Sequence, residues 1–198
     1  MIKPSQHLQR FSLKLIILWL DIHIWEGGIL KIALCGYLGS GCTEVAEVLA
    51  STFNLEVFNT SRILSSLGDF SSLSRSGEID MDKIIRDKLM EILKGDNVII
   101  EGRSAFMLLN RKDVIKIFLN APFESRVKHV AERRGISIED ARDDVARSDR
   151  DRETLVQRLY GKNPLDASNY DFVINTSSKP YSRIAEILVS VIENLLKE

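Results

Sequence analysis

The chain has 198 residues, of which 44% are hydrophobic, and its formal net charge at pH 7 is −1. This length is enough for one domain with a sizeable core, and the near-zero charge excludes nucleic-acid binding by a broad basic surface. The two cysteines, Cys35 and Cys42, are too few and too close for a disulfide framework, so we expect a reducing, cytoplasmic setting.

Residues 1–28 differ in character from the rest of the chain. Residues 11–25 are strongly apolar, but Lys14, Asp21 and His23 interrupt the run before it reaches the roughly 20 residues that a membrane span needs. No small-residue cleavage site follows, as a signal peptide would require. We interpret residues 1–28 as an appended or wrongly assigned leader, with a membrane-surface helix or an oligomerisation segment as alternatives, and expect no membrane association of the functional domain, residues 30–198.

A glycine-rich loop follows the first predicted strand, residues 30–35, and precedes a predicted helix. The loop reads Gly36-Tyr37-Leu38-Gly39-Ser40-Gly41-Cys42-Thr43 and fits the phosphate-binding pattern GxxxxGK[ST], except that Cys42 stands in place of lysine. Amides at a helix N-terminus favour an anion. We therefore expect ATP to bind here and the Thr43 hydroxyl to bind Mg²⁺, with the alternative that this is an ordinary strand-to-helix turn; the predicted ATP-binding residues are Gly36, Gly39, Ser40, Gly41, Cys42 and Thr43.

Cys42 allows two interpretations. At a helix N-terminus its thiol could have a lowered pKa and a redox role. We favour the simpler interpretation that Cys42 is a small neutral residue of the loop.

The remaining elements alternate between strand and helix. Apolar runs predict strands at 55–58, 97–103, 114–119 and 170–175, and periodic patterns predict helices beginning at residue 60 and spanning 80–93, 122–134, 137–160 and 181–196. Serine and glycine in residues 65–77 predict a mobile loop. This alternation is typical of an α/β domain whose parallel sheet is covered by helices on both faces.

Charged and polar residues follow the predicted strands, where open α/β sheets bind ligands. Arg62 follows the second strand, the triplet Glu101-Gly102-Arg103 ends the third, and Asn175 ends the fifth. Because arginine binds phosphate through two parallel hydrogen bonds, Arg62 and Arg103 suit the phosphate of an acceptor. The alternative is that Arg62 is a surface residue and that Arg103 pairs with Glu101.

A second group of arginines lies in the charged stretch 137–160. Interleaved acids and bases of this kind usually form a solvated helix face. Beside a phosphate loop without lysine, we favour a helical, arginine-rich lid that brings cations to a transferring phosphoryl group; the arginines concerned are Arg142, Arg147, Arg150, Arg152 and Arg158.

Together these motifs resemble the archaeal-type cytidylate kinases and their relatives among the P-loop nucleoside monophosphate kinases. The resemblance rests on the lysine-free loop, the Glu-Gly-Arg triplet, the arginine-rich lid and the run Tyr170-Asp171-Phe172-Val173-Ile174-Asn175-Thr176, in that order. It implies a P-loop NTPase fold with a five-stranded parallel sheet of order 2-3-1-4-5. It also implies transfer of the γ-phosphoryl group of ATP, with Mg²⁺, to a nucleoside monophosphate, with CMP or dCMP favoured, by a monomer or homodimer.

The resemblance also implies roles for individual residues. Arg103 would bind the acceptor phosphate, with Arg62 as a further contact and Glu101 near the acceptor or the water shell of Mg²⁺. Arg147 and Arg150 would close over the transferring group, and Asn175 would contact ATP. Asp151 would contact the cytosine, and Arg158 could replace the arginine that relatives carry where this chain has Thr154. Two alternatives remain: a degenerate nucleotide-binding regulatory protein, or a kinase acting on another nucleotide, on dephospho-coenzyme A or on a sugar acid.

Overall fold

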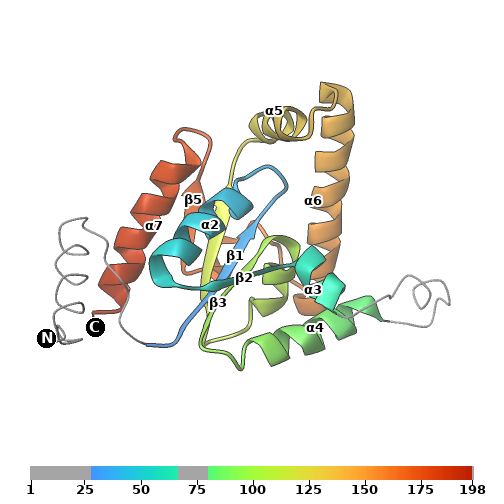
Figure 1. Ribbon diagram of the computed structural model, residues 1–198. Helices are drawn as coiled ribbons and strands as arrows, with labels where there is room; N and C mark the ends of the chain where they lie inside the picture. Colours follow the sequence, from blue (N-terminus) through green and yellow to red (C-terminus); the bar gives the residue numbers. More distant parts are fainter. Residues whose placement is uncertain (1–27, 67–79, 198) are drawn as a thin grey trace, which may run out of the picture.

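The computed structural model describes residues 28–66 and 80–197 (Figure 1). The leader predicted for residues 1–28 therefore lies, apart from its last residue, outside the described residues. Most of the predicted loop at 65–77 also lies outside them.

Five parallel strands form the central sheet in the order β2-β3-β1-β4-β5, which confirms the predicted topology. Their bounds are β1 (Leu30–Gly36), β2 (Glu56–Asn59), β3 (Asn97–Glu101), β4 (Ile115–Asn120) and β5 (Phe172–Asn175). Leu34 of β1 pairs in register with Glu101 of β3. The carboxyl end of β3 therefore lies beside the start of the glycine-rich loop.

Helices cover both faces of the sheet, as predicted. Their bounds are α2 (Cys42–Phe53), α3 (Thr60–Ser66), α4 (Met81–Ile92), α5 (Phe123–Arg134), α6 (Ile138–Tyr160) and α7 (Tyr181–Leu195). The described residues also form 3₁₀ helices at Gly102–Leu108 (η2) and Ala167–Asn169 (η3). One prediction was wrong at its end: the third strand stops at Glu101 rather than at residue 103. Gly102 takes a positive φ of 76°, which an extended strand does not allow, and η2 begins there.

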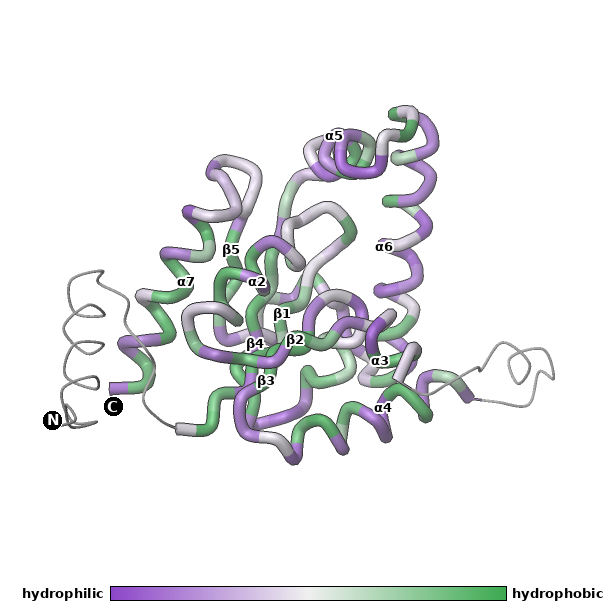
Figure 2. The backbone as a smooth tube through the Cα atoms, viewed as in Figure 1, coloured by the Kyte–Doolittle hydropathy of each residue, from purple (hydrophilic) through white to green (hydrophobic). Residues whose placement is uncertain are grey.

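The two faces of the sheet belong to different cores. Ile32 and Leu34 of β1 pack with α2 and α7, while Ala33 and Cys35 pack with α3, α4, η2 and the C-terminal half of α6. Alternate residues of a strand point to opposite faces, which explains this division. In Figure 2 the strands are mainly green, and the helices have polar outer faces. A strand buried on both sides needs the continuous apolar run that β1 has.

A smaller apolar cluster lies away from the sheet, between α5 and the first half of α6. It contains Val127 and Val130 of α5 and Ala141 and Val145 of α6. Farther along α6, Leu155 and Val156 belong to the main core. In Figure 1, α6 runs beside the sheet and α5 packs across its end, so α6 connects the two clusters.

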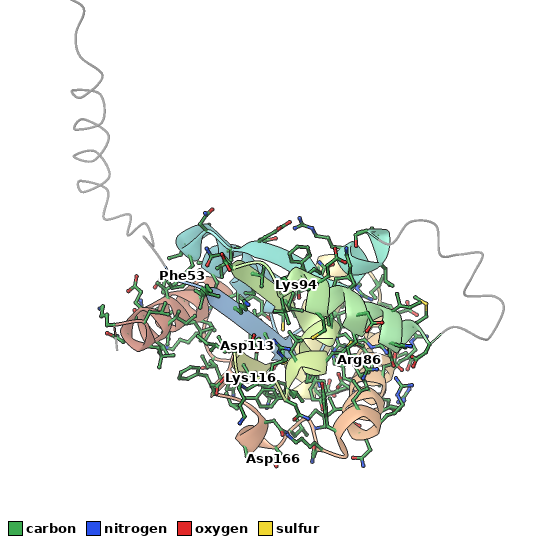
Figure 3. All side chains as sticks on the ribbon, turned by 90° about the horizontal axis from the view of Figure 1, so that it is seen from below. Phe53, Arg86, Lys94, Asp113, Lys116 and Asp166 are labelled. Atoms are coloured by element: carbon green, nitrogen blue, oxygen red, sulfur yellow. The ribbon has the colours of Figure 1, made fainter. Side chains whose placement is uncertain are left out.

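The amino ends of the strands differ in chemistry from the carboxyl ends. Figure 3 views the molecule from this side and labels Asp113 and Lys116, which lie near the start of β4. The Lys116 ammonium is 3.2 Å from the Asp171 carboxylate and also donates to the carbonyls of Arg111 and Val114. These charges are paired with nearby protein groups, whereas the glycine-rich loop lies at the opposite end of the sheet.

Within the described ranges 28–66 and 80–197, none of the helices combines the length and the apolar character needed to cross a bilayer.

Candidate active site

The glycine-rich loop joins β1 to α2 and has the conformation that its glycines predict. Gly39 and Gly41 have φ values of 85° and 89°, in the left-handed region that favours glycine. A Cβ atom on Gly41 would overlap the ring of Tyr181, and one on Gly39 would lie 2.7 Å from the Arg126 carbonyl oxygen. Both positions therefore require glycine for conformation and for space.

The loop carbonyls accept hydrogen bonds from the surrounding protein. The donors and distances are Arg152 Nε to Gly36 (3.0 Å), Ser40 Oγ to Tyr37 (2.7 Å), Arg126 Nη1 to Leu38 (3.2 Å), Tyr181 Oη to Gly39 (3.1 Å) and Thr176 Oγ1 to Ser40 (3.0 Å). Within the described parts of the chain, the amides of Gly39, Gly41, Cys42 and Thr43 donate to no acceptor. With its carbonyls held and these amides free at the start of α2, the loop is suited to bind phosphate.

Cys42 is buried, and its environment disfavours the thiolate. Burial raises the pKa of the Cys42 thiol to about 12, and the nearby Glu101 carboxylate acts in the same direction. Its sulfur lies 3.7 Å from the Ser40 hydroxyl. The suggestion of a lowered pKa was wrong, because burial raises the pKa of this thiol, and the simpler interpretation of Cys42 as a small neutral residue agrees with the structure.

Thr43 and Glu101 bring two oxygen ligands together beside the loop. The Thr43 hydroxyl donates to Glu101 Oε1 at 3.4 Å, and Glu101 is only 6% exposed. Burial raises the pKa of Glu101, although hydrogen bonds from Asn59 and Thr43 oppose the rise. A hydroxyl and a buried carboxylate fit Mg²⁺, which usually binds one or two protein oxygens together with phosphates and water. Among the described residues no group of three or more His, Cys, Asp or Glu side chains could hold a metal alone.

A cavity of about 460 Å³ lies beside the loop, between η2, the start of α3 and α6. Its walls contain Arg103 and Glu101 from one side and Arg147 and Asp151 from the other. Arg147 is 66% exposed and forms an ion pair with Asp144. The full lining is Leu38, Asn59, Thr60, Ser61, Glu101, Gly102, Arg103, Arg134, Asp144, Arg147, Ser148, Asp151 and Arg152. Four predicted site residues thus meet in one cavity.

Arg103 does not form the structural pair with Glu101 that we considered as an alternative. Among the described residues, its nearest carboxylate is that of Asp82 on α4, at 3.8 Å, and its buried Nε atom has no hydrogen-bond partner there. Asp82 also forms an ion pair with Arg158. The Arg103 guanidinium therefore retains hydrogen-bonding capacity at the cavity.

Outside the glycine-rich loop, five predicted residues do not line this cavity, and one of them, Arg142, pairs with Glu124 on the surface. Arg62 donates to the Val57 carbonyl and to Glu56 and stacks on Phe58, so it lies on the surface beside β2, the other interpretation that we considered. Arg150 is exposed, and Arg158 lines a separate cavity with Glu153 and Lys162. Asn175 accepts hydrogen bonds from the amide and hydroxyl of Ser177, so it shapes the turn after β5.

Sequence reasoning did not single out two arginines that contact the loop. Arg126 on α5 is 4% exposed and bonds to the Leu38 carbonyl and to both carboxylate oxygens of Asp149. Arg152 was noted only as a member of the charged stretch. Helical spacing was an available signal, because Arg152 follows Ala141, Val145 and Ser148 on the inward face of α6.

A second cavity, of about 310 Å³, lies on the other side of the loop. It is lined by Gly39, Ala121, Ser125, Lys128, His129, Glu132, Thr176, Ser177, Lys179, Pro180 and Tyr181. His129 packs edge-on against Tyr181, with ring centroids 5.0 Å apart, and its Nε2 atom is 3.3 Å from Glu44 Oε1. The loop therefore separates two cavities, one rich in arginine and one with mixed polar and aromatic walls.

Comparison with known proteins identifies the family. The model of the cytidylate kinase-like family matches residues 61–178. The chain belongs to the cytidylate kinase-like family. It is 32% identical to the cytidylate kinase of Sulfolobus acidocaldarius, over 82% of this chain and 94% of the relative, and 30% identical to that of Pyrococcus horikoshii, over 84% and 90%. This membership confirms the resemblance and identifies the protein as a kinase.

Solved structures confirm the fold. An uncharacterized protein from Eubacterium ventriosum superposes with a TM-score of 0.65 at 19% identity, covering 83% of this chain and 98% of the other. A shikimate kinase from Bacteroides thetaiotaomicron gives a TM-score of 0.58 at 16% identity, covering 86% and 99%. At these identities the likeness concerns the fold alone, which is that of the P-loop kinases.

Proposed function

We propose that this member of the cytidylate kinase-like family transfers the γ-phosphoryl group of ATP to a nucleoside monophosphate, with CMP or dCMP as the favoured acceptor. The observation that supports the proposal most directly is the free row of loop amides beside a cavity lined by arginines and carboxylates. Relatives named cytidylate kinase at about 30% identity support the choice of acceptor.

The donor would bind across the loop. The amides of Gly39, Gly41, Cys42 and Thr43 would hold its phosphates, and the helix dipole of α2 would favour their charge. Thr43, with Glu101 nearby, would hold Mg²⁺, which reduces the phosphate charge during transfer. The second cavity, beside Thr176 and Tyr181, is the candidate site for the base and ribose of ATP. Asn175 would act indirectly, through the turn that precedes this cavity.

The acceptor would bind in the arginine-lined cavity. Arg103 would bind its phosphate, because a guanidinium matches phosphate geometry, and Arg147 would contact the transferring group. Asp151, on the same wall, would accept hydrogen bonds from an amino group of the base. Arg150 and Arg158 stay candidates for contacts in the complex with both substrates, since neither lines the cavity in the structure.

This arrangement accounts for catalysis by positioning. Phosphoryl transfer needs the attacking oxygen, the phosphorus and the leaving oxygen in line, and it needs cations around the equatorial oxygens. Walls that exclude water also prevent hydrolysis of ATP without an acceptor. No covalent intermediate with the protein is required.

A coupled assay of ADP formation tests the proposal. The purified protein would be incubated with Mg²⁺ and ATP and with CMP, dCMP, UMP, AMP, GMP, shikimate or dephospho-coenzyme A in turn. We expect the highest kcat/KM with CMP or dCMP and loss of activity in Arg103→Met. Turnover restricted to a non-nucleotide acceptor would overturn the proposal, as would ATP binding without turnover on any acceptor.

A further inference from the structure

We infer that Arg152 of α6 supplies the fixed positive charge that the loop lysine supplies in a GxxxxGK[ST] sequence. The inference deepens the proposed function and rests on it where it concerns phosphoryl transfer. Three features support it: the direction of the Cys42 side chain, the hydrogen bonds of Arg152, and the lack of a carboxylate partner for Arg152 in the described parts of the chain.

Cys42 and Arg152 both contact Gly36, the first residue of the loop. A Cβ atom built on Gly36 would lie 2.5 Å from the Cys42 sulfur, so the side chain at position 42 turns back towards the start of the loop. The Gly36 carbonyl accepts a hydrogen bond from Arg152 Nε at 3.0 Å. The Arg152 guanidinium and the side chain at position 42 thus approach the same part of the loop, the former from α6.

Hydrogen bonds hold Arg152 in this position. Its Nη1 atom donates to the Ser148 carbonyl at 3.0 Å and also to the Ser148 hydroxyl. Together with the bond to Gly36, these contacts occupy Nε and Nη1. In residues 28–66 and 80–197, Nη2 donates to no protein acceptor, and Arg152 lines the cavity. One edge of the guanidinium is therefore free to donate to a phosphate oxygen.

Arg152 also differs in its ion pairing from the other arginines that line the cavity. Arg103 lies near Asp82, and Arg134 and Arg147 each form an ion pair with Asp144. No carboxylate of the described residues lies within ion-pair distance of Arg152. Burial lowers the pKa of Arg152. The neighbouring Cys42 and Asp149 oppose this shift, and the charges of Arg103 and Arg126 act in the same direction as burial. A bound phosphate would supply the missing counter-charge.

The test combines removal of the arginine with restoration of the lysine. The main comparison uses wild type, Arg152→Met, Cys42→Lys and the double variant, and two further variants serve as controls. Arg152→Lys is a conservative variant that keeps the charge. Arg111→Met is the matched control, because Arg111 pairs with Asp113 on the surface just before β4, at the opposite end of the sheet from the cavity. Circular dichroism and thermal unfolding establish that each variant is folded.

We expect Arg152→Met to lower kcat about 100-fold, as loss of one donor to a transition-state oxyanion does, and Arg152→Lys to retain part of the activity. Cys42→Lys should raise kcat in the Arg152→Met background and should not raise it in the wild type, where the charge is already present. Arg111→Met should behave as the wild type. A wild-type kcat in folded Arg152→Met, or an equal gain from Cys42→Lys in both backgrounds, would overturn the inference.

A binding measurement separates this inference from the proposed function. The affinities of ATP and adenosine are measured by calorimetry for wild type and Arg152→Met. We expect Arg152→Met to weaken ATP binding and leave adenosine binding unchanged. If no nucleoside monophosphate is phosphorylated, the proposed function fails, and this ATP-specific loss still decides whether Arg152 acts on phosphate. Equal affinities of wild type and variant for ATP would overturn the inference on its own.

Discussion

The guanidinium of Arg126 donates two hydrogen bonds to the carboxylate of Asp149, at 2.9 and 2.7 Å, and thereby joins α5 to α6 beside the glycine-rich loop. Arg126 is 4% exposed and also donates to the Leu38 and Ala121 carbonyls. Removal of one partner from this buried ion pair should cost more stability than removal of one partner from a surface pair, because the remaining charge has little access to water.

The Arg126–Asp149 pair leads to a stability prediction. Asp149→Ala should lower the free energy of unfolding by about 3–5 kcal/mol, because it leaves a buried, unpaired cation. Glu124→Ala is the matched control: it breaks a second two-bond pair between α5 and α6, that of Arg142 with Glu124, which lies on the surface. Denaturant unfolding should show a large loss for Asp149→Ala and almost none for Glu124→Ala. Similar losses in the two variants would contradict the argument.

Arg103 and Arg62 should differ in their effects on the acceptor. Arg103 lines the cavity, whereas Arg62 bonds to Glu56 and Val57 outside it. Arg103→Met should raise the KM for the acceptor and lower kcat, and Arg62→Met should leave both close to wild type. Steady-state kinetics with the acceptor varied at saturating ATP measures this contrast. A raised acceptor KM in Arg62→Met would instead support the role first predicted for it.

Glu101 should make the stability of the ligand-free protein depend on pH. Burial raises its folded-state pKa above the ordinary value of 4.5, so its contribution is fully present below that value and is lost as pH rises through the raised pKa. Glu101→Gln lacks this loss. Its melting temperature relative to wild type should therefore increase between pH 4.5 and neutral pH.

Addition of Mg²⁺ and ATP should reduce this difference in melting temperature, because the ionised Glu101 carboxylate of the wild type gains a cation. Thermal unfolding with and without Mg²⁺ and ATP, for wild type and Glu101→Gln, measures both effects. The same pH dependence in the two proteins would argue against a raised pKa of Glu101.

Cys42 should be an unreactive thiol in the folded protein. Burial raises its pKa to about 12, and Cys35, also buried, has its pKa raised by burial as well. At pH 8 almost no thiolate is present, so a disulfide reagent should react slowly with native protein and fully after unfolding. Cys35→Ala isolates the behaviour of Cys42. Fast labelling of native Cys35→Ala would show that the loop opens.

The sequence predicted most of the fold, because its signals are local. The apolar run of β1, the glycines of the loop and the periodicity of α6 each indicate one element, and the order of elements implies a parallel sheet. The end of β3 was placed wrongly, since a positive φ at Gly102 leaves little trace in a hydrophobic pattern. The status of residues 1–28, the cytoplasmic setting and the oligomeric state stay predictions.

The candidate site was predictable only in part. Arg103 and Glu101 were recognised because they follow a strand, and Arg147 and Asp151 because they lie in a charged helix. Arg126 was overlooked since its role depends on burial between α5, the loop and Asp149, which are distant in sequence. Charge in a sequence indicates an available cation, but the partner of that cation is a property of tertiary structure.

The continuous helix α6 has a consequence for motion in the catalytic cycle. It contains no glycine or proline over its 23 residues, about 35 Å, and Leu155 and Val156 fix its second half in the main core. A helix of this kind does not fold back like a hinged flap. We expect substrates to be enclosed chiefly by rotamer changes of exposed side chains such as Arg147, which take picoseconds to nanoseconds, so that backbone opening at α6 would not limit turnover.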